Sequence, residues 1–301
     1  MSPFRTLLYE ATGAIARIEL NRPDSGNALT LVTPGELAAA IERANLDPAV
    51  HVIALSGRGP GFCSGYDLTL LNAAAAGSLE TPPGSPLDPA VQRANHDPQQ
   101  PWDPTIDFAM MMRNVRGFMS VFHSEKPVVC KVHGFCLGGG TDLALCADLL
   151  LVEDAAKIGY PPSRVWGVPT TAFWVTRIGA EKAKRLLFTG DCLNGTEAAA
   201  WGLALEAAPI AELNDKFEHL LERIARLPVN QLVMIKLLIN QSVAAQGLYG
   251  SQLLGTIFDG ISRHTKEGYA FQRRVAEAGV KQAVRERDQP FGDAGRSTFR
   301  G

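Results

Sequence analysis

Two short segments with the same layout constrain the fold more than any other feature of this chain. The first, GFCSGYDL, spans residues 61–68, and the second, GFCLGGGTDL, spans residues 134–143. Each follows a strand-like run and leads into a segment of helical character, which predicts a strand–turn–helix corner. Glycines ahead of a helix let another group approach the unpaired backbone N–H groups of its first turn. The two corners therefore predict an α/β core that can offer backbone donors to a ligand.

Strand-like and helix-like segments alternate around these corners. Apolar and polar residues alternate over residues 15–20, and short β-rich runs occupy residues 51–57 and 126–134. Residues 33–44 place apolar side chains at helical spacing, with Pro34 in a first turn that tolerates proline. This alternation is typical of an α/β fold.

Two regions depart from the alternation. From about Asn214 strand-like runs disappear, so we expect an α/β core over residues 1–213 and a helical region over residues 214–301. Residues 72–105 are rich in proline, alanine and glycine and lack sustained periodicity. Because α/β patterns resume after them, we expect an insertion that forms a long surface loop or lid.

The composition excludes several classes of partner. The 301 residues are 46% hydrophobic and carry a formal net charge of −2, which makes nucleic acid and anionic membranes poor candidates. No apolar run reaches the length of about 20 residues that spans a bilayer, and the first residues lack a secretory pattern. The five cysteines show no CxxC pairing, so we expect no disulfide framework and no metal site. A cytoplasmic protein is the expectation.

The glycines of the two corners have three possible uses. Two N–H groups aimed at one oxygen form an oxyanion hole, in which a single donor contributes about 2.7–4 kcal/mol to lowering a barrier. Phosphate binding is a second use, but the GK[ST] and GxGxxG patterns are absent from the sequence. Close packing of helix on strand is the third, and the glycines alone do not distinguish it from the first.

The order and spacing of several motifs resemble the crotonase family, which includes the enoyl-CoA hydratases and isomerases. The motifs are NRPDSGNAL, GRGPGFCSGYDL, KPVVCKVHGFCLGGGTDLALCADLLLV, AKIGYPP and RIGAEKAKRLLFTGDCLNGTEAAAWGL, followed by SRHTKEGYAF and RDQPF. The resemblance covers most of the chain and implies a spiral of β-β-α units with a C-terminal helical region for oligomerisation. It also implies homotrimers or dimers of trimers, and an acyl-CoA thioester as substrate, with coenzyme A as part of that substrate and no separate cofactor.

Carried over by position, the resemblance implies a set of site residues. The backbone N–H groups of Tyr66 and Gly139 would form the oxyanion hole, and Asp142 would move protons as the acid or base. An acidic residue in a first helical turn also offsets the helix dipole without doing chemistry, and that alternative stays open. Further contacts to the substrate are expected from Arg22, Ala28, Ser64, Gly65, Asp67, Leu68, Gly138, Pro162 and Ser163. Arg285 or Arg287 could reach a phosphate of a neighbouring subunit's ligand.

The sequence departs from the family at the second catalytic glutamate. Pro162 or Ser163 takes that position, and neither side chain is a general base at neutral pH. The sequence offers five other residues that could replace this glutamate: Tyr160, Arg164, Asp97, Asp103 and Asp107. The ring of Tyr66 could either narrow the acyl pocket or pack outward.

These residues predict an acyl-CoA enzyme of the enoyl-CoA hydratase/isomerase type, a lyase or isomerase that acts in fatty acid metabolism. One carboxylate suits isomerisation, or another step through an enolate, better than a hydration that uses two bases. The alternatives are a non-catalytic acyl-CoA binding protein and a different crotonase reaction, such as that of a dienoyl-CoA isomerase or a hydrolase. The proline-rich insertion is expected to border the acyl pocket.

Overall fold

A six-stranded sheet forms the centre of the molecule. The computed structural model describes residues 4–68 and 81–292. The strands of this sheet, in spatial order, are β1 (Leu7–Thr12), β2 (Ile15–Leu20), β3 (Val52–Gly57), β4 (Val128–Val132), β6 (Leu149–Glu153) and β9 (Glu206–Ala208). β1 and β2 form an antiparallel hairpin, and every other neighbouring pair is parallel. The alternating segment 15–20 is thus β2, as its pattern predicted.

Both faces of the sheet are covered, which explains the near-continuous apolar runs of the central strands. In β3, Ile53 and Leu55 face the main core, whereas Val52 and Ala54 face a smaller cluster on the other side. Phe217 of α8 (Ile210–Ala225) packs into that smaller cluster. On the main face lie α1 (Thr33–Leu46) and α3 (Pro104–His123), which pack against each other.

A second, three-stranded sheet stands beside the first and carries one glycine corner. Its strands are β5 (Phe135–Leu137), β7 (Lys157–Gly159) and β8 (Cys192–Leu193), in that order. Short helices connect and follow these strands: α4 (Gly139–Ala144), α5 (Trp174–Ile178), α6 (Ala180–Thr189) and α7 (Gly195–Trp201). The result is a mixed α/β fold, as the sequence predicted.

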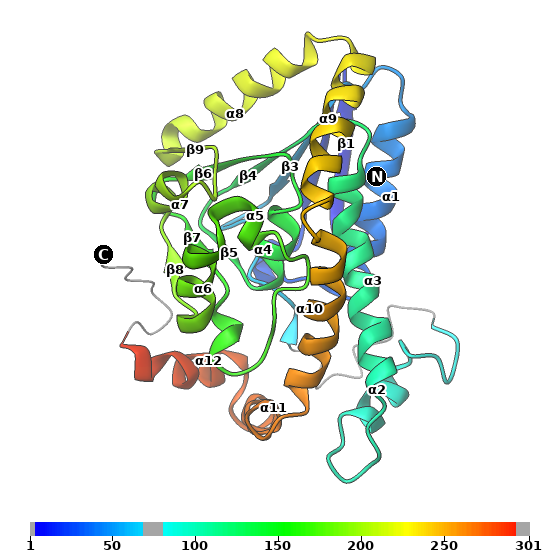
Figure 1. The fold of residues 1–301 in the computed structure, drawn as a ribbon, viewed down its shortest axis with the longest axis vertical. Coiled ribbons are helices and arrows are strands. Elements are labelled where there is room, and N and C mark those ends of the chain that lie inside the picture. Colours follow the sequence, from blue (N-terminus) through cyan, green and yellow to red (C-terminus); the bar gives the residue numbers. More distant parts are fainter. Residues whose placement is uncertain (1–3, 69–80, 293–301) are drawn as a thin grey trace.

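After β9 the remaining elements of the described chain are helical. They are α8, α9 (Val229–Ala244), α10 (Leu248–Arg263), α11 (Lys266–Ala278) and α12 (Val280–Asp288). α9 and α10 follow one another as a long rod, and α10 lies alongside α3 (Figure 1). α11 and α12 lie at the opposite end of the molecule from α8 (Figure 1).

The proline-rich insertion contains more order than its composition suggests. Part of it, residues 72–80, lies outside the described residues. Within the rest, residues 89–95 form the helix α2, which Pro89 begins and the Asp88 side chain caps by accepting a hydrogen bond from the backbone N–H of Ala90. The sequence predicted a long surface loop or lid over residues 72–105 and did not predict this helix, because a capped proline can start a helix that is too short to show periodicity.

Within residues 4–68 and 81–292, no helix is both long enough and apolar enough to cross a membrane.

Candidate active site

The two glycine corners of the sequence lie against each other in the structure. The backbones of Cys63 and Cys136 pair in an isolated parallel β-bridge. The Leu137 N–H donates a hydrogen bond to the Cys63 carbonyl over 2.9 Å. A β-carbon built on Gly65, which has φ +102°, would stand 3.6 Å from the backbone nitrogen of Gly139. The left-handed φ requires glycine at position 65, and so does the Leu137 carbonyl oxygen, which would lie only 3.0 Å from the same β-carbon.

The backbone N–H groups of Tyr66 and Gly139 have no acceptor among the described residues. Around Tyr66, the Gly65 carbonyl accepts from Leu29, and the Asp67 N–H donates to the Leu29 carbonyl. Gly139 begins α4, whose preceding residue Gly138 has φ 53° and donates its own N–H to Gly159. The N–H groups of Tyr66 and Gly139 are therefore available to bind a ligand, as the first-turn donors of a helix commonly are.

The Tyr66 ring turns inward and packs over one of these donors. A β-carbon on Gly139 would lie 2.7 Å from Cε2 of that ring, so only glycine fits beneath it. The ring also lies 6.3 Å from the ring of Phe118, centroid to centroid. Its hydroxyl is buried and has no hydrogen-bond partner in the described part of the chain. Burial raises the pKa of this phenol well above its usual value, and the nearby charges of Asp142 and Asp259 add to that shift. Of the two predicted orientations, the inward one is found.

Asp142 is fully buried in the first turn of α4, and its two oxygens differ sharply. Oδ1 accepts hydrogen bonds from the Thr170 N–H (3.0 Å), the Thr171 N–H (3.2 Å) and the Thr171 hydroxyl (3.1 Å). Oδ2 is buried and has no partner within the described residues. Burial raises the pKa of this carboxyl to about 7, against the lowering effect of the Thr171 hydrogen bonds. The carboxyl is therefore held by one oxygen and poised to exchange a proton near neutral pH.

Sequence reasoning missed an ion pair on α10 that faces this carboxyl. Asp259 accepts from the Arg263 guanidinium at 2.8 Å and from the Val168 N–H at 3.2 Å, and it is buried. Its charge contributes to the raised pKa of Asp142 and to that of Tyr160, which burial raises well above its usual value. No local pattern marks these residues, because α10 reaches the site only by packing along α3.

The predicted contact residues of the first corner are tied together by Arg22. Its guanidinium forms an ion pair with Asp67 at 2.9 Å and donates to the Ala28 carbonyl at 2.6 Å. Ser64 is exposed, and its N–H donates to the Gly26 carbonyl. The Arg22 cation is thus engaged inside the protein, where it braces the turn.

The predicted contacts of the second corner surround Gly138. Cγ of Pro162 would lie 3.2 Å from a β-carbon on Gly138, which places the two residues together. The Ser163 hydroxyl donates to the Tyr160 carbonyl at 3.0 Å. Leu68 is half-buried and packs on a separate cluster around Phe271.

The substitutes proposed for the second glutamate have other partners. Arg164 is buried and pairs with Asp191 and Asp288, each at 3.1 Å. Asp103 caps α3, where its carboxylate accepts from the Thr105 N–H, and Asp97 accepts from Gln99. Of the two remaining candidates, Tyr160 is buried, and Asp107 accepts hydrogen bonds from Asn95 and Trp102.

The two arginines of the last helix that were predicted to bind a phosphate differ in pairing and exposure. Arg287 pairs with Asp288 over 2.8 Å, whereas Arg285 is exposed at the surface.

Comparison with known proteins relates this arrangement to a single family. The family model for enoyl-CoA hydratase/isomerase matches residues 10–94 and 108–273. EchA13 of Mycobacterium tuberculosis, which carries an enoyl-CoA hydratase name, is 31% identical over 264 residues, covering 81% of this chain and 76% of its own. Carnitinyl-CoA dehydratase of Proteus mirabilis is 29% identical over 73% of this chain and 75% of its own. A crystal structure of an enoyl-CoA hydratase from Mycobacterium smegmatis is 52% identical, covers 98% of each chain and superposes with a TM-score of 0.92. The chain therefore belongs to the enoyl-CoA hydratase/isomerase family of enzymes, also called crotonases.

Proposed function

We propose that this enzyme binds an acyl-CoA thioester and stabilises its enolate in a backbone oxyanion hole. The thioester oxygen accepts hydrogen bonds from the N–H groups of Tyr66 and Gly139. Supporting this are the close approach of the two corners and the lack of a protein acceptor for either N–H among the described residues. The relatives named above act on, or are named for, CoA thioesters, in keeping with the proposed substrate.

Asp142 is the acid and base of the proposed reaction. The observation that carries this assignment is the contrast between its oxygens: three donors hold Oδ1, while Oδ2 has no partner in the described chain. As a carboxylate, Asp142 takes a proton from a carbon adjacent to the conjugated system, and the electrons move onto the thioester oxygen. The resulting carboxylic acid returns the same proton to another carbon, which isomerises the double bond with no net change in protons.

Double-bond isomerisation fits the carboxyl groups of the site better than hydration does. Pro162 stands beside Gly138, at the position where the family resemblance calls for a second glutamate. Asp259 is the other carboxylate whose charge reaches Asp142, but it is already paired with the Arg263 guanidinium at 2.8 Å. We assign Asp259 an electrostatic role, in which its negative charge keeps the pKa of Asp142 high.

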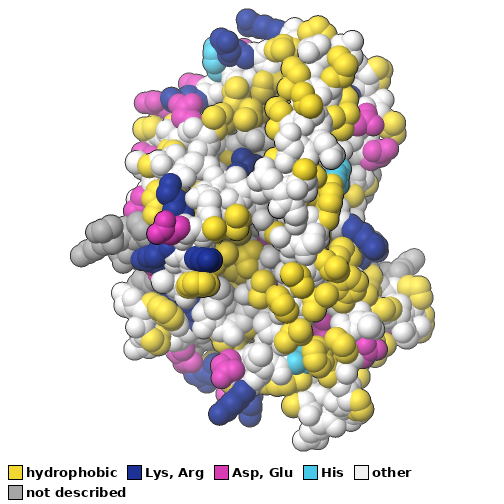
Figure 2. All heavy atoms as spheres, viewed as in Figure 1, with side chains coloured by type: hydrophobic (Ala, Val, Ile, Leu, Met, Phe, Trp, Pro, Cys, Tyr) yellow, Lys and Arg dark blue, Asp and Glu magenta, His cyan; other side chains and the backbone are white. Residues whose placement is uncertain are grey.

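We also propose that the protein assembles as a homotrimer or a dimer of trimers through α9 and α10. Figure 2 shows hydrophobic side chains along these two helices. The large apolar residues that α9 and α10 expose include Met234, Ile235, Leu237, Leu238, Ile239, Leu253, Leu254, Ile257, Phe258 and Ile261. A patch of this kind is typical of a subunit interface.

We also propose that the protein is located in the cytoplasm. Its five cysteines are buried and free, as is usual for proteins of a reducing compartment.

The test of the proposed reaction compares the wild type with Asp142→Asn on a series of 2-enoyl- and 3-enoyl-CoA thioesters. Asparagine keeps the shape of the side chain and cannot exchange the proton, so we expect kcat/KM to fall about 10²–10⁴-fold. Absorbance of the conjugated thioester and identification of the product report the reaction. Asp215→Asn, at an exposed position of α8, is the matched control and should retain full activity.

Two outcomes would contradict the proposal. Unchanged turnover in Asp142→Asn would remove Asp142 from the chemistry. Binding of acyl-CoA by the wild type without turnover of any thioester in the series would instead support the non-catalytic binding protein.

A further inference from the structure

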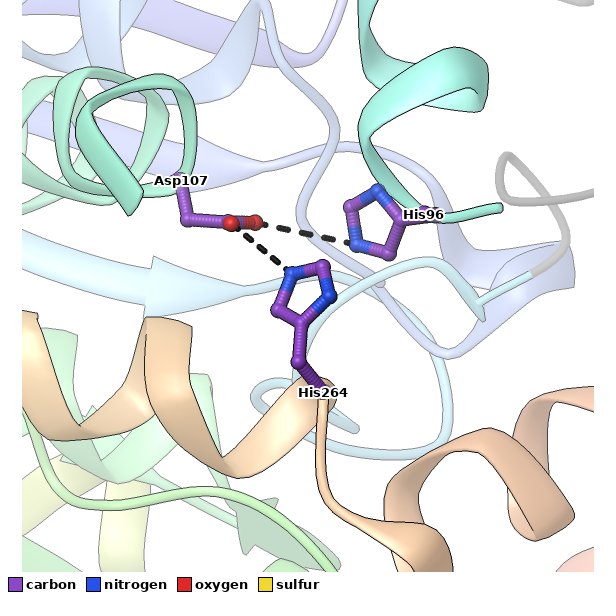
Figure 3. A group of neighbouring side chains, drawn as sticks. All are labelled: His96, Asp107 and His264. Atoms are coloured by element: carbon purple, nitrogen blue, oxygen red, sulfur yellow. Dashed lines mark hydrogen bonds and ion pairs between the residues drawn. The ribbon is translucent and has the colours of Figure 1, made fainter. Parts of the chain in front are cut away.

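A cluster of one buried aspartate and two partly buried histidines lies outside the proposed active site. His96 follows α2, Asp107 belongs to the first turn of α3, and His264 caps the C-terminal end of α10. The two imidazole rings approach the Asp107 carboxylate from different elements (Figure 3). One atom from each side chain falls within a group whose members all lie within 4.8 Å of one another.

Both histidines direct Nε2 toward the carboxylate and bind an oxygen through Nδ1. Nδ1 of His96 lies 2.8 Å from the Gln92 carbonyl, and Nδ1 of His264 lies 2.8 Å from the Tyr269 hydroxyl. Since a carbonyl can only accept, the proton of a neutral His96 resides on Nδ1, and Nε2 carries a lone pair. Metal-binding histidines are commonly oriented in this way, with the second ring nitrogen bonded to a carbonyl or another oxygen.

The two carboxylate oxygens of Asp107 differ in their hydrogen bonds. Oδ2 accepts from Asn95 Nδ2 and Trp102 Nε1, each at 2.9 Å, and lies 2.9 Å from His264 Nε2. Oδ1 has no hydrogen-bond partner among the described residues, nor does His96 Nε2, which is 3.7 Å from it. Asp107 is completely buried, so an unpartnered oxygen there is costly.

Two lone-pair atoms that face each other at 3.7 Å fit a shared cation. Nitrogen and oxygen ligands bind zinc at about 2.0–2.2 Å, so two of them lie at most about 4.4 Å apart around one ion. The separation of 3.7 Å is within this limit, and the ligand atoms of all three side chains lie within 4.8 Å of one another, close to it. Imidazole nitrogen favours zinc and similar transition ions, whereas Mg²⁺ and Ca²⁺ prefer ligand sets made of oxygen.

We propose that His96 Nε2, Asp107 Oδ1 and His264 Nε2 bind a divalent transition ion of the zinc type. On binding, His264 holds its proton on Nδ1, where the Tyr269 hydroxyl can accept it, because a phenol accepts as well as donates. The ion neutralises the buried carboxylate and joins the proline-rich insertion to α3 and α10. Cysteine spacing gave no hint of this site, because none of its ligands is a cysteine and His264 lies far along the chain from the other two.

The proposal does not depend on the acyl-CoA chemistry and has its own test. The tag-free protein is freed of metal with a chelator and titrated with Zn²⁺ by calorimetry, with Mg²⁺ as the control ion. We expect one Zn²⁺ per chain, a higher unfolding temperature with Zn²⁺ than with Mg²⁺, and visible absorbance from Co²⁺ bound in place of Zn²⁺. All five cysteines are buried, so thiols do not compete in the folded state.

Three variants locate the ion. His96→Ala removes a partly exposed ligand, and Asp107→Asn keeps the shape of the buried one; both should lose the bound Zn²⁺ and its effect on unfolding temperature. His219→Ala, at an exposed position of α8, should bind Zn²⁺ as the wild type does. The proposal is overturned if the wild type binds no Zn²⁺, or if His96→Ala, folded by circular dichroism, binds it with unchanged stoichiometry.

Discussion

At the scale of single residues, Asp142 combines a cost in stability with a gain in reactivity. Its carboxyl is fully buried and keeps one oxygen without a partner in the described residues, and burial raises its pKa to about 7. An acid with that pKa is present in both protonation states at neutral pH, which serves proton transfer in both directions. The same burial makes the charged form unfavourable in the folded protein.

This cost predicts how stability changes with pH. The pKa of Asp142 is raised from 3.8 in the unfolded chain to about 7 in the folded protein. Below about pH 4 the carboxyl is protonated in both states, so its burial carries no charge penalty. As the pH rises toward 7 the unfolded chain loses this proton more readily than the folded protein, and the free energy of unfolding decreases. The neutral amide of the Asp142→Asn variant carries no such penalty, so above pH 7 the variant should be more stable than the wild type by up to about 4 kcal/mol. Urea unfolding at pH 5 and pH 8 measures the difference, which should be larger at pH 8. A difference that is equal at both values would show that the folded carboxyl titrates normally.

At the scale of elements, the packing of α3 on α1 depends on one glycine. A β-carbon on Gly117 would lie 2.4 Å from Cβ of Pro34 and 2.5 Å from its carbonyl oxygen. Backbone atoms set that limit, so no rotation of a side chain relieves it. This close crossing fixes the position of α3, and α3 in turn carries Phe118 beneath the Tyr66 ring and supports α10.

Gly117→Ala should therefore destabilise the protein, although alanine is the better helix former. We expect a loss of about 1–3 kcal/mol from the forced separation of α1 and α3. Gly35→Ala is the control on the same pair of helices, because its nearest non-local atom would be 3.9 Å away, and it should stabilise by about 0.5–1 kcal/mol. Urea denaturation of both variants tests this. Equal effects of the two substitutions would show that the helix crossing is not tight.

At the scale of the whole molecule, the distribution of apolar surface is uneven. The sheet is covered on both faces, yet α9 fully buries only Leu232 and Lys236 and exposes five large apolar residues: Met234, Ile235, Leu237, Leu238 and Ile239. Leu238 is 72% exposed, and fully burying such a side chain contributes about 1.5–3 kcal/mol. This exposed apolar surface supports the proposed subunit interface along α9 and α10.

Leu238→Glu should shift the protein from a trimer or hexamer toward the monomer, because each interface would bury an unpaired charge. Light scattering on a size-exclusion column measures the mass. Ala211→Glu adds the same charge at an exposed position of α8 and should leave the mass unchanged. A monomeric wild type, or an unaltered mass for Leu238→Glu, would refute the proposed interface.

Local pattern was enough to predict the elements that have a clear period. The alternation of residues 15–20 is β2, the run at 51–57 contains β3, and the amphipathic segment 33–44 lies inside α1. The two corners were also predictable, since glycines between strand and helix have few other uses. α2 was missed because seven residues give too few turns for a period to appear.

The sequence by itself determined the family, the α/β class, the two glycine corners and the place of Asp142 in a first helical turn, because these depend on neighbours along the chain. Only the tertiary structure decided which way the Tyr66 ring points and which oxygen of Asp142 is held. It alone brought Asp259 beside Asp142, and gathered His96, Asp107 and His264. Such groupings depend on how α2, α3 and α10 pack, and packing joins residues that no local period relates.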